Sequence, residues 1–193
     1  MRVKDKSELR KSLRAARQDH VAALPDATRG LLFRHPPAPL LDVIAHNAVI
    51  GLYRATPYEA PTSHYANFFL EHGHTIALPR FDGRSAPMQF ARHTDPLGES
   101  DLEDGPFGLM QPAADAAAVE PTVLFVPLLG FTERGERIGQ GGGHYDRWLA
   151  DHPGTVAIGM AWDCQLCESL PVEEHDMPLA AIVTPTRLYG AFA

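Results

Sequence analysis

The chain has 193 residues, of which 45% are hydrophobic, and a formal net charge of −7. This length and apolar content suit one globular domain, covering residues 1–193, with a substantial core. An acidic chain lacks the broad basic face that general nucleic-acid binding needs. No apolar run is long enough to span a membrane, and residues 1–17 lack the apolar centre of a signal peptide. We therefore expect a cytoplasmic protein.

The pattern from residue 3 to about residue 24 predicts an amphipathic helix, and Pro25 follows its end. Basic residues recur along it at three- and four-residue steps and therefore share one face: Lys6, Arg10, Arg14 and Arg17. On the residues alone, such a face is most simply interpreted as solvated surface.

The rest of the chain alternates between strand and helix signals. Strands are predicted by apolar runs at residues 48–53, 74–79, 87–91, 122–126, 155–161 and 179–184. Helices are predicted at residues 61–73, at a short segment near residues 40–46, and after Gly143, whereas residues 95–112 are rich in proline and glycine and predict a loop. This alternation predicts an α/β fold, in which a single three-layered domain has a mostly parallel central sheet flanked by helices.

Residues 126–149, VPLLGFTERGERIGQGGGHYDRWL, hold the clearest chemical signal. An apolar strand leads into a loop with Arg134 and Arg137, then into a glycine turn and a helix. Glycines can place several backbone N–H groups on one surface, and a helix start adds its own unpaired N–H groups, so the arrangement suits phosphate. Asp146 lies just beyond the turn, where a carboxylate could hold Mg²⁺ against phosphate oxygens. Without further information, a tight turn with no ligand would be the simpler interpretation of the glycines.

The cysteines, Cys164 and Cys167, are too few for a disulfide framework. Their CxxC spacing could indicate a zinc site or a redox pair, but zinc needs further ligands and a reactive thiol needs a lowered pKa. The neighbouring Asp163 and Glu168 would instead raise the thiol pKa values. We interpret the spacing as coincidental.

The stretch at residues 126–149 resembles the signature of the 5-formyltetrahydrofolate cyclo-ligases, also called 5,10-methenyltetrahydrofolate synthetases. In that family a strand ending in Val-Pro precedes an Arg-x-Gly-x-Gly-Gly-Gly-Tyr-Tyr-Asp-Arg-like loop. Four other segments also resemble the family. The segment from Lys6 to Arg10 resembles its Lys-x-x-x-Arg motif, and residues 105–112 resemble its Gly-x-Phe-Gly-Ile-x-Glu-Pro motif. Residues 162–165 resemble Phe-x-x-Gln, and residues 170–176 resemble Leu-Pro-x-Glu-x-His-Asp.

The resemblance implies the same single-domain fold and an ATP- and Mg²⁺-dependent closure of 5-formyltetrahydrofolate to 5,10-methenyltetrahydrofolate, with release of ADP and phosphate. It implies small-molecule substrates, with neither nucleic acid nor membrane as a partner, and we expect a monomer.

The resemblance also implies roles for the residues at matching positions. The expected ATP-binding residues are Lys6, Arg10, Arg137, Gly139, Gln140, Gly141, Gly142, Gly143, His144 and Tyr145. The expected folate-binding residues are Arg54, Glu59, Phe107 and Tyr145. Lys6 and Arg137 are also expected to be catalytic, and Asp146 and Asp176 to hold Mg²⁺, directly or through water. Phe107 could offer a ring for a flat heterocycle or could equally anchor its loop.

The chain departs from the family pattern at Thr132, His144, Ala180 and Pro185. His144 stands where the first of two tyrosines is usual, and it could stack, donate to phosphate or do neither. These departures leave two alternatives open: an ATP-dependent enzyme of this fold that acts on another folate or amide, and a protein that binds folate or nucleotide without turnover. The retained Lys6, Asp146 and Asp176 favour an enzyme, because a pure binder has little need for a complete phosphate-and-metal set.

Overall fold

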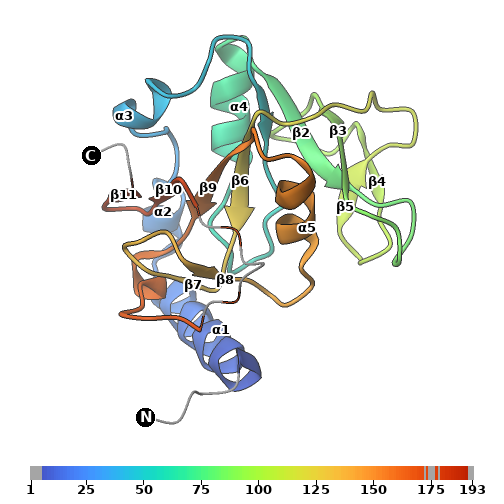
Figure 1. The fold of residues 1–193 in the computed structure, drawn as a ribbon. Helices are drawn as coiled ribbons and strands as arrows, with labels where there is room; N and C mark the ends of the chain where they lie inside the picture. The colour runs from blue at the N-terminus through green and yellow to red at the C-terminus, as the bar shows by residue number, and fades with distance from the viewer. Residues whose placement is uncertain (1–5, 172, 174–176, 178, 191–193) are drawn as a thin grey trace.

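The centre of the molecule is a seven-stranded sheet (Figure 1). The computed structural model describes residues 6–171, 173, 177 and 179–190. The strands of the sheet are β1 (Val49–Gly51), β2 (Thr75–Arg80), β3 (Gln89–His93), β6 (Val123–Pro127), β9 (Val156–Met160), β10 (Ala181–Val183) and β11 (Leu188–Gly190). Their order is β11-β10-β9-β6-β1-β2-β3, in which the strands from β10 to β2 run parallel and the two edge strands run antiparallel. This confirms the predicted mostly parallel sheet.

Helices cover both faces of this sheet (Figure 1). They are α1 (Lys6–Ala23), α2 (Asp26–Arg29), α3 (Ala38–Leu41), α4 (Ser63–Glu71) and α5 (His144–Asp151), with a short 3-10 helix at Asp163–Gln165. Among the described residues, no helix is long and apolar enough to cross a membrane.

The central strand β6 shows why the domain has three layers. Its side chains alternate between faces, as those of every strand do. Val123 and Phe125 join a core that includes residues of α1 and α4, whereas Leu124 and Val126 join a second core beneath α5. A strand that is buried on both faces has an unbroken apolar run in its sequence, which is the pattern from Val123 to Val126. The helices on each face are therefore held by burial of alternate residues of the same strands.

Several short strands lie where the sequence predicted loop. Residues 95–112 contain the antiparallel hairpin of β4 (Leu102–Asp104) and β5 (Met110–Pro112), which corrects the loop prediction. A second hairpin, of β7 (Gly130–Phe131) and β8 (Arg137–Ile138), precedes the glycine turn. The edge strand β11 was also not predicted. Strands of two or three residues are too short to show an alternating pattern, so tertiary pairing decides them.

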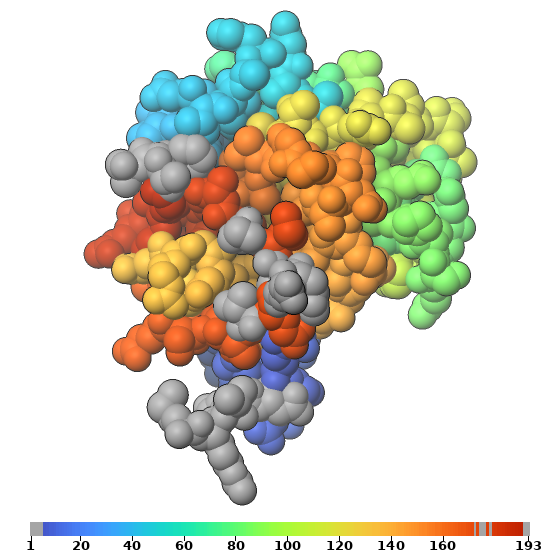
Figure 2. Space-filling view, viewed as in Figure 1, coloured from blue at the N-terminus to red at the C-terminus, as the bar shows by residue number. Residues whose placement is uncertain are grey.

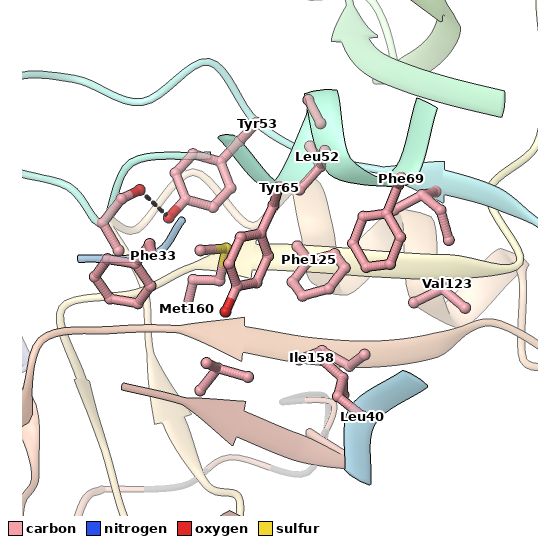
Figure 3. Packing of buried hydrophobic residues seen from close by; sticks show 14 of the residues in the cluster. Phe33, Leu40, Leu52, Tyr53, Tyr65, Phe69, Val123, Phe125, Ile158 and Met160 are labelled. Atoms are coloured by element: carbon pink, nitrogen blue, oxygen red, sulfur yellow. Dashed lines mark hydrogen bonds between the residues drawn. The ribbon is translucent and has the colours of Figure 1, made fainter. Parts of the chain in front are cut away.

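Phe125 is expected to be one of the largest single contributors to stability. It is fully buried, and its ring lies 5.8 Å from that of Tyr65 and 5.9 Å from that of Phe69. Figure 3 shows the three side chains side by side in the core. We expect Phe125→Ala to lower the free energy of unfolding by about 3–5 kcal/mol, because it removes buried apolar area and leaves a cavity. Urea unfolding followed by circular dichroism measures this. Leu31→Ala, at a 65% exposed position, is the control; equal losses for both would contradict the prediction.

Candidate functional site

A cavity of about 610 Å³ lies at the carboxyl ends of the parallel strands. Tyr53 follows β1, Pro79 belongs to β2, and Val126 and Pro127 end β6, and all of them line this cavity. Open α/β sheets bind ligands at this edge, because loops of variable sequence meet there over a rigid frame.

Every described residue of the expected ATP, folate and metal sets lines this one cavity. They are Lys6, Arg10, Arg54, Glu59, Phe107, Arg137, Gly139, Gln140, Gly141, Gly142, Gly143, His144, Tyr145 and Asp146. The remaining expected residue, Asp176, lies outside the described residues. The fold thus brings together residues that are far apart in the sequence, although their roles stay predictions.

The glycine turn has the backbone that its sequence suggests. Gly141 has a φ of 103° and Gly143 a φ of 64°, both in the left-handed region that residues with a Cβ rarely adopt. Gly143 is the N-cap of α5, which begins at His144 as predicted. A Cβ at Gly141 would lie 3.4 Å from Cζ of Arg10, so the turn passes close to α1. Side chains at these positions would strain the turn and crowd the cation beside it.

The cationic face of α1 contacts the glycine turn. Arg10 Nε donates to the carbonyl oxygen of Gly139 at 3.0 Å, and Arg14 donates to Oε1 of Gln140 at 2.7 Å. Figure 2 shows the α1 residues (blue) at the lower edge of the molecule, below the orange region to which the glycine turn and α5 belong. Lys6 and Arg10 line the cavity, and Lys6 Nζ lies 3.2 Å from a carboxylate oxygen of Glu173. Their part of this face is therefore cavity wall and not open surface.

Arg137 and Asp146 form a partly buried ion pair inside the cavity wall. The Arg137 side chain is only 4% exposed and also donates to the carbonyl oxygen of Met177. Two residues that were expected to contact phosphate and metal separately therefore contact each other in this structure. Within the described part of the chain, no group of three or more His, Cys, Asp or Glu side chains could hold a metal ion. Mg²⁺ that binds mainly through nucleotide phosphates needs only one or two protein carboxylates, and Asp146 fits that requirement.

Glu59 also lines the cavity and is held within the loop that follows β1. Its Oε2 accepts a hydrogen bond from the Thr56 backbone N–H at 2.9 Å. Tyr145 lies near it: burial raises the pKa of the Tyr145 hydroxyl, and the Glu59 charge raises it further, so this phenol stays protonated at neutral pH. Arg54, which lines the cavity and lies in the same loop as Glu59, forms an ion pair with Glu99, a contact that the sequence did not predict. This region therefore offers a carboxylate, a phenol and a guanidinium to one ligand.

Three aromatic side chains of the cavity wall, Phe81, Phe107 and His144, lie together. The rings of Phe81 and His144 lie 5.0 Å apart, and Phe107 lies 4.9 Å from Phe81 and 5.7 Å from His144. Phe107 is near the tip of the β4–β5 hairpin and is 43% exposed, so it could contact a ligand. Sequence reasoning missed Phe81, although its place directly after the predicted strand at residues 74–79 could have identified it.

His144 is the departure from the family pattern that lies at the cavity. Of Thr132, His144, Ala180 and Pro185, all of them described, only His144 lines the cavity. Thr132 instead donates to a Glu136 carboxylate oxygen at 2.9 Å, within the β7–β8 turn. The position that changes the chemistry of the cavity is therefore His144.

We expect His144 to be neutral near neutral pH in the nucleotide-free protein. Burial lowers the pKa of its imidazole, and the charge of Arg147 lowers it further. A bound polyphosphate would favour the protonated form, so ATP affinity should rise modestly as the pH falls from about 8 to about 6. Calorimetric titrations of the wild type and of His144→Tyr test this, since protonation of ATP itself is common to both. Identical pH profiles would contradict it.

The cysteine pair shows no sign of activation. Cys164 and Cys167 are both free. Burial raises the pKa of each thiol, and Asp163 raises that of Cys164 further, in the direction predicted from the sequence. A raised thiol pKa lowers the thiolate fraction and hence the reactivity of both residues.

Two solved structures have a fold similar to that of this chain. The structure has a TM-score of 0.73 to the 5,10-methenyltetrahydrofolate synthetase of Aquifex aeolicus, at 24% identity and covering 96% of this chain and 92% of that one. A synthetase of the same name from Mycoplasma pneumoniae gives a TM-score of 0.64 at 20% identity, covering 93% of this chain and 98% of that one. These likenesses establish the shared fold.

Sequence comparisons identify the family. The 5-formyltetrahydrofolate cyclo-ligase of Escherichia coli (strain K12) is 44% identical over 97 residues, which are 47% of this chain and 53% of that protein. The Mus musculus enzyme of the same name is 28% identical over 159 residues, 73% of this chain and 77% of that protein. The chain thus spans about half the length of the bacterial relative that it matches. The family model for 5-formyltetrahydrofolate cyclo-ligases matches residues 2–185. Because that match extends over nearly the whole chain, the protein belongs to the 5-formyltetrahydrofolate cyclo-ligase family.

Proposed function

We propose that the protein converts 5-formyltetrahydrofolate to 5,10-methenyltetrahydrofolate in an ATP- and Mg²⁺-dependent reaction that releases ADP and phosphate. One observation carries the proposal: the described residues of the expected nucleotide and folate sets line a single cavity of about 610 Å³. ATP-driven ring closure needs the γ-phosphate and the formyl group in one enclosure, because the reacting atoms must approach within about 3–3.5 Å. Separate cavities for the two sets would have argued against it.

The reaction activates a poor leaving group. The formyl oxygen attacks the γ-phosphorus of ATP, the bond to the bridging oxygen breaks, and ADP leaves. The product is an imidate phosphate, in which the former formyl oxygen has become part of a phosphate. N10 of the same molecule then attacks the formyl carbon, loses its proton and expels phosphate, which closes the methenyl bridge. Little covalent chemistry falls to the protein, so catalysis consists of positioning and charge stabilisation.

The glycine turn and the basic residues beside it would bind the nucleotide. Lys6 and Arg10 would exchange their present partners, Glu173 and the Gly139 carbonyl, for phosphate oxygens. The backbone N–H groups of the glycine turn and the start of α5 would bind the same phosphates, aided by the positive end of the helix dipole. Arg137 is proposed to stabilise the charge that develops during phosphoryl transfer.

Mg²⁺ would be held by Asp146 together with nucleotide oxygens, and by Asp176 as the family resemblance implies. When bound, it would neutralise phosphate charge and so make the phosphorus easier to attack. Arg137 contacts the Oδ1 atom of Asp146, so the other carboxylate oxygen would serve the ion, directly or through water, with the ion pair intact.

The folate would occupy the other side of the cavity. Glu59 and Tyr145 offer an acceptor and a donor to its polar edge, and Arg54 offers a cation to its carboxylates. Phe107 and its aromatic neighbours offer faces and edges against which a flat ring can pack, worth about 0.5–1.5 kcal/mol for each such contact. We further propose that the protein acts as a cytoplasmic monomer on these small molecules.

An absorbance assay tests the proposal directly. The purified protein is mixed with 5-formyltetrahydrofolate and MgATP, and the absorption band of the methenyl product is followed. We expect the band to grow only when ATP and Mg²⁺ are both present, with ADP released in equal amount. Replacing ATP with ADP, and removing Mg²⁺ with a chelator, are the controls. Folate binding without turnover under all these conditions would overturn the proposed reaction.

A further inference from the structure

Arg17 is a buried cation beside the cavity whose role the sequence pattern does not explain. It lies on the face of α1 that packs inward, and its side chain is only 4% exposed. Its Nη1 lies 3.4 Å from the carbonyl oxygen of Leu128, and its Nε has no hydrogen-bond partner among the described residues. A buried charge is costly unless a nearby opposite charge compensates it.

The carboxylate that compensates Arg17 is Glu59. Arg17 Nη1 lies 3.7 Å from Oε1 of Glu59, whose side chain is 9% exposed. The other oxygen, Oε2, accepts the Thr56 N–H at 2.9 Å. Each carboxylate oxygen of Glu59 therefore has its own partner, Oε1 in an ion pair and Oε2 in a hydrogen bond, and these contacts restrain the orientation of the group.

The backbone of this loop has anchors that do not involve Arg17. The Tyr53 hydroxyl donates to the carbonyl oxygen of Ala60 at 2.7 Å, and the Glu59 N–H donates to that of Thr56 at 3.0 Å. Thr62 Oγ1 donates to the carbonyl oxygen of Tyr53 at 2.6 Å. The path of the loop is thus held independently, and Arg17 acts on the Glu59 carboxylate itself.

We propose that Arg17 is a positioning residue of the folate site: its ion pair with Glu59 holds that carboxylate in place at the cavity wall. This inference rests on the proposed binding of folate by Glu59. The amino-pyrimidinone ring of a folate presents adjacent N–H donors, and a carboxylate held in one orientation can accept them in charge-assisted hydrogen bonds. Arg17 itself does not line the cavity, so its effect must pass through Glu59.

A double-mutant cycle read out by binding tests the proposal. The affinity for 5-formyltetrahydrofolate is measured by calorimetry for the wild type, Arg17→Met, Glu59→Gln and the double variant, without nucleotide. We expect each single change to weaken binding about tenfold or more, and the double variant to bind within about twofold of Glu59→Gln, because Arg17 has lost its target. An equal loss from Arg17→Met in both backgrounds, or no loss at all, would overturn the proposal.

Further measurements separate positioning from a general effect on folding. In turnover assays, Arg17→Met should raise KM for the folate while KM for ATP stays within about twofold. Lys11→Met, which removes an exposed cation from the same helix, is the matched control and should change neither. Equal increases in both KM values for Arg17→Met would indicate a merely structural role.

The double-mutant cycle can still be interpreted if one variant folds poorly. A single change leaves one charge buried without its partner, whereas the double variant removes both charges and should be the more stable. If Arg17→Met does not fold, the comparison of Glu59→Gln with the double variant decides: equal folate affinity supports the proposal, and a further tenfold loss, about 1.4 kcal/mol, overturns it.

Failure of the proposed reaction is a different result. A wild-type protein that binds 5-formyltetrahydrofolate without turning it over would overturn the reaction, but the binding cycle for Arg17 would still be decisive. A wild-type protein that binds no folate would overturn both.

Discussion

Deletion of residues 1–10 is expected to abolish ATP-dependent turnover and to leave most of the fold intact. The deletion removes Lys6 and Arg10 from the cavity wall, together with the hydrogen bond from Arg10 to the Gly139 carbonyl. Loss of even one preorganised donor to a charged transition state typically costs about a hundredfold or more in kcat. The residues of α1 that join the core, Arg17 and Val21, remain. The assay is turnover of 5-formyltetrahydrofolate with MgATP, beside circular dichroism of both proteins.

Point variants make this result specific. Lys6→Ala and Arg10→Ala should each lower kcat/KM and weaken ATP binding, since each removes one cation from the phosphate region. Lys11→Ala, at an exposed position of the same helix, should have no effect beyond about twofold. Normal turnover by the truncated protein would mean that these residues are only a structural contact for the glycine turn.

Asp146→Asn is expected to lower kcat/KM by about tenfold or more, because it removes the described carboxylate best placed for Mg²⁺. The ion pair with Arg137 gives the same substitution a second consequence. Removing the carboxylate takes one charged partner away from the Arg137 guanidinium, whose side chain is 4% exposed, so the free energy of unfolding should also fall. Urea unfolding measures this loss, and steady-state kinetics measure the first effect.

A titration with Mg²⁺ separates these two causes. If Asp146 holds the metal, the variant should need a higher Mg²⁺ concentration for half-maximal activity, and excess Mg²⁺ should recover part of the rate. If Asp146 serves only to orient Arg137, the Mg²⁺ dependence should match that of the wild type while the rate stays low. Full activity at ordinary Mg²⁺ concentrations would exclude both roles.

Much of the frame could be predicted because its signals are local. The run at residues 122–126 is apolar at every position from Val123 to Val126, which is what a strand buried on both faces requires. Gly141 and Gly143 have positive φ, a conformation that favours glycine. The cluster of glycines was therefore a local signal for the turn. His144 begins its helix directly after that turn.

The short elements could not be predicted because their stability comes from distant partners. The hairpin that carries Phe107 consists of strands of three residues each, which form by pairing with one another and by packing on the sheet. Helix α3 likewise spans only residues 38–41, shorter than the segment predicted near residues 40–46. In such segments intrinsic propensity is a weak signal, and tertiary contacts override it.

The sequence by itself determined the α/β class, the strand–turn–helix around the glycines and, through resemblance, the residues to examine. Only the tertiary structure decided which side chains meet. It pairs Arg137 with Asp146, although the resemblance assigned Arg137 to phosphate and Asp146 to Mg²⁺. It also buries Arg17 against Glu59, although the helical pattern grouped Arg17 with the other cations of its helix. The physical reason is that periodicity specifies which residues share a face, whereas burial and charge pairing depend on segments that folding brings together from distant parts of the chain.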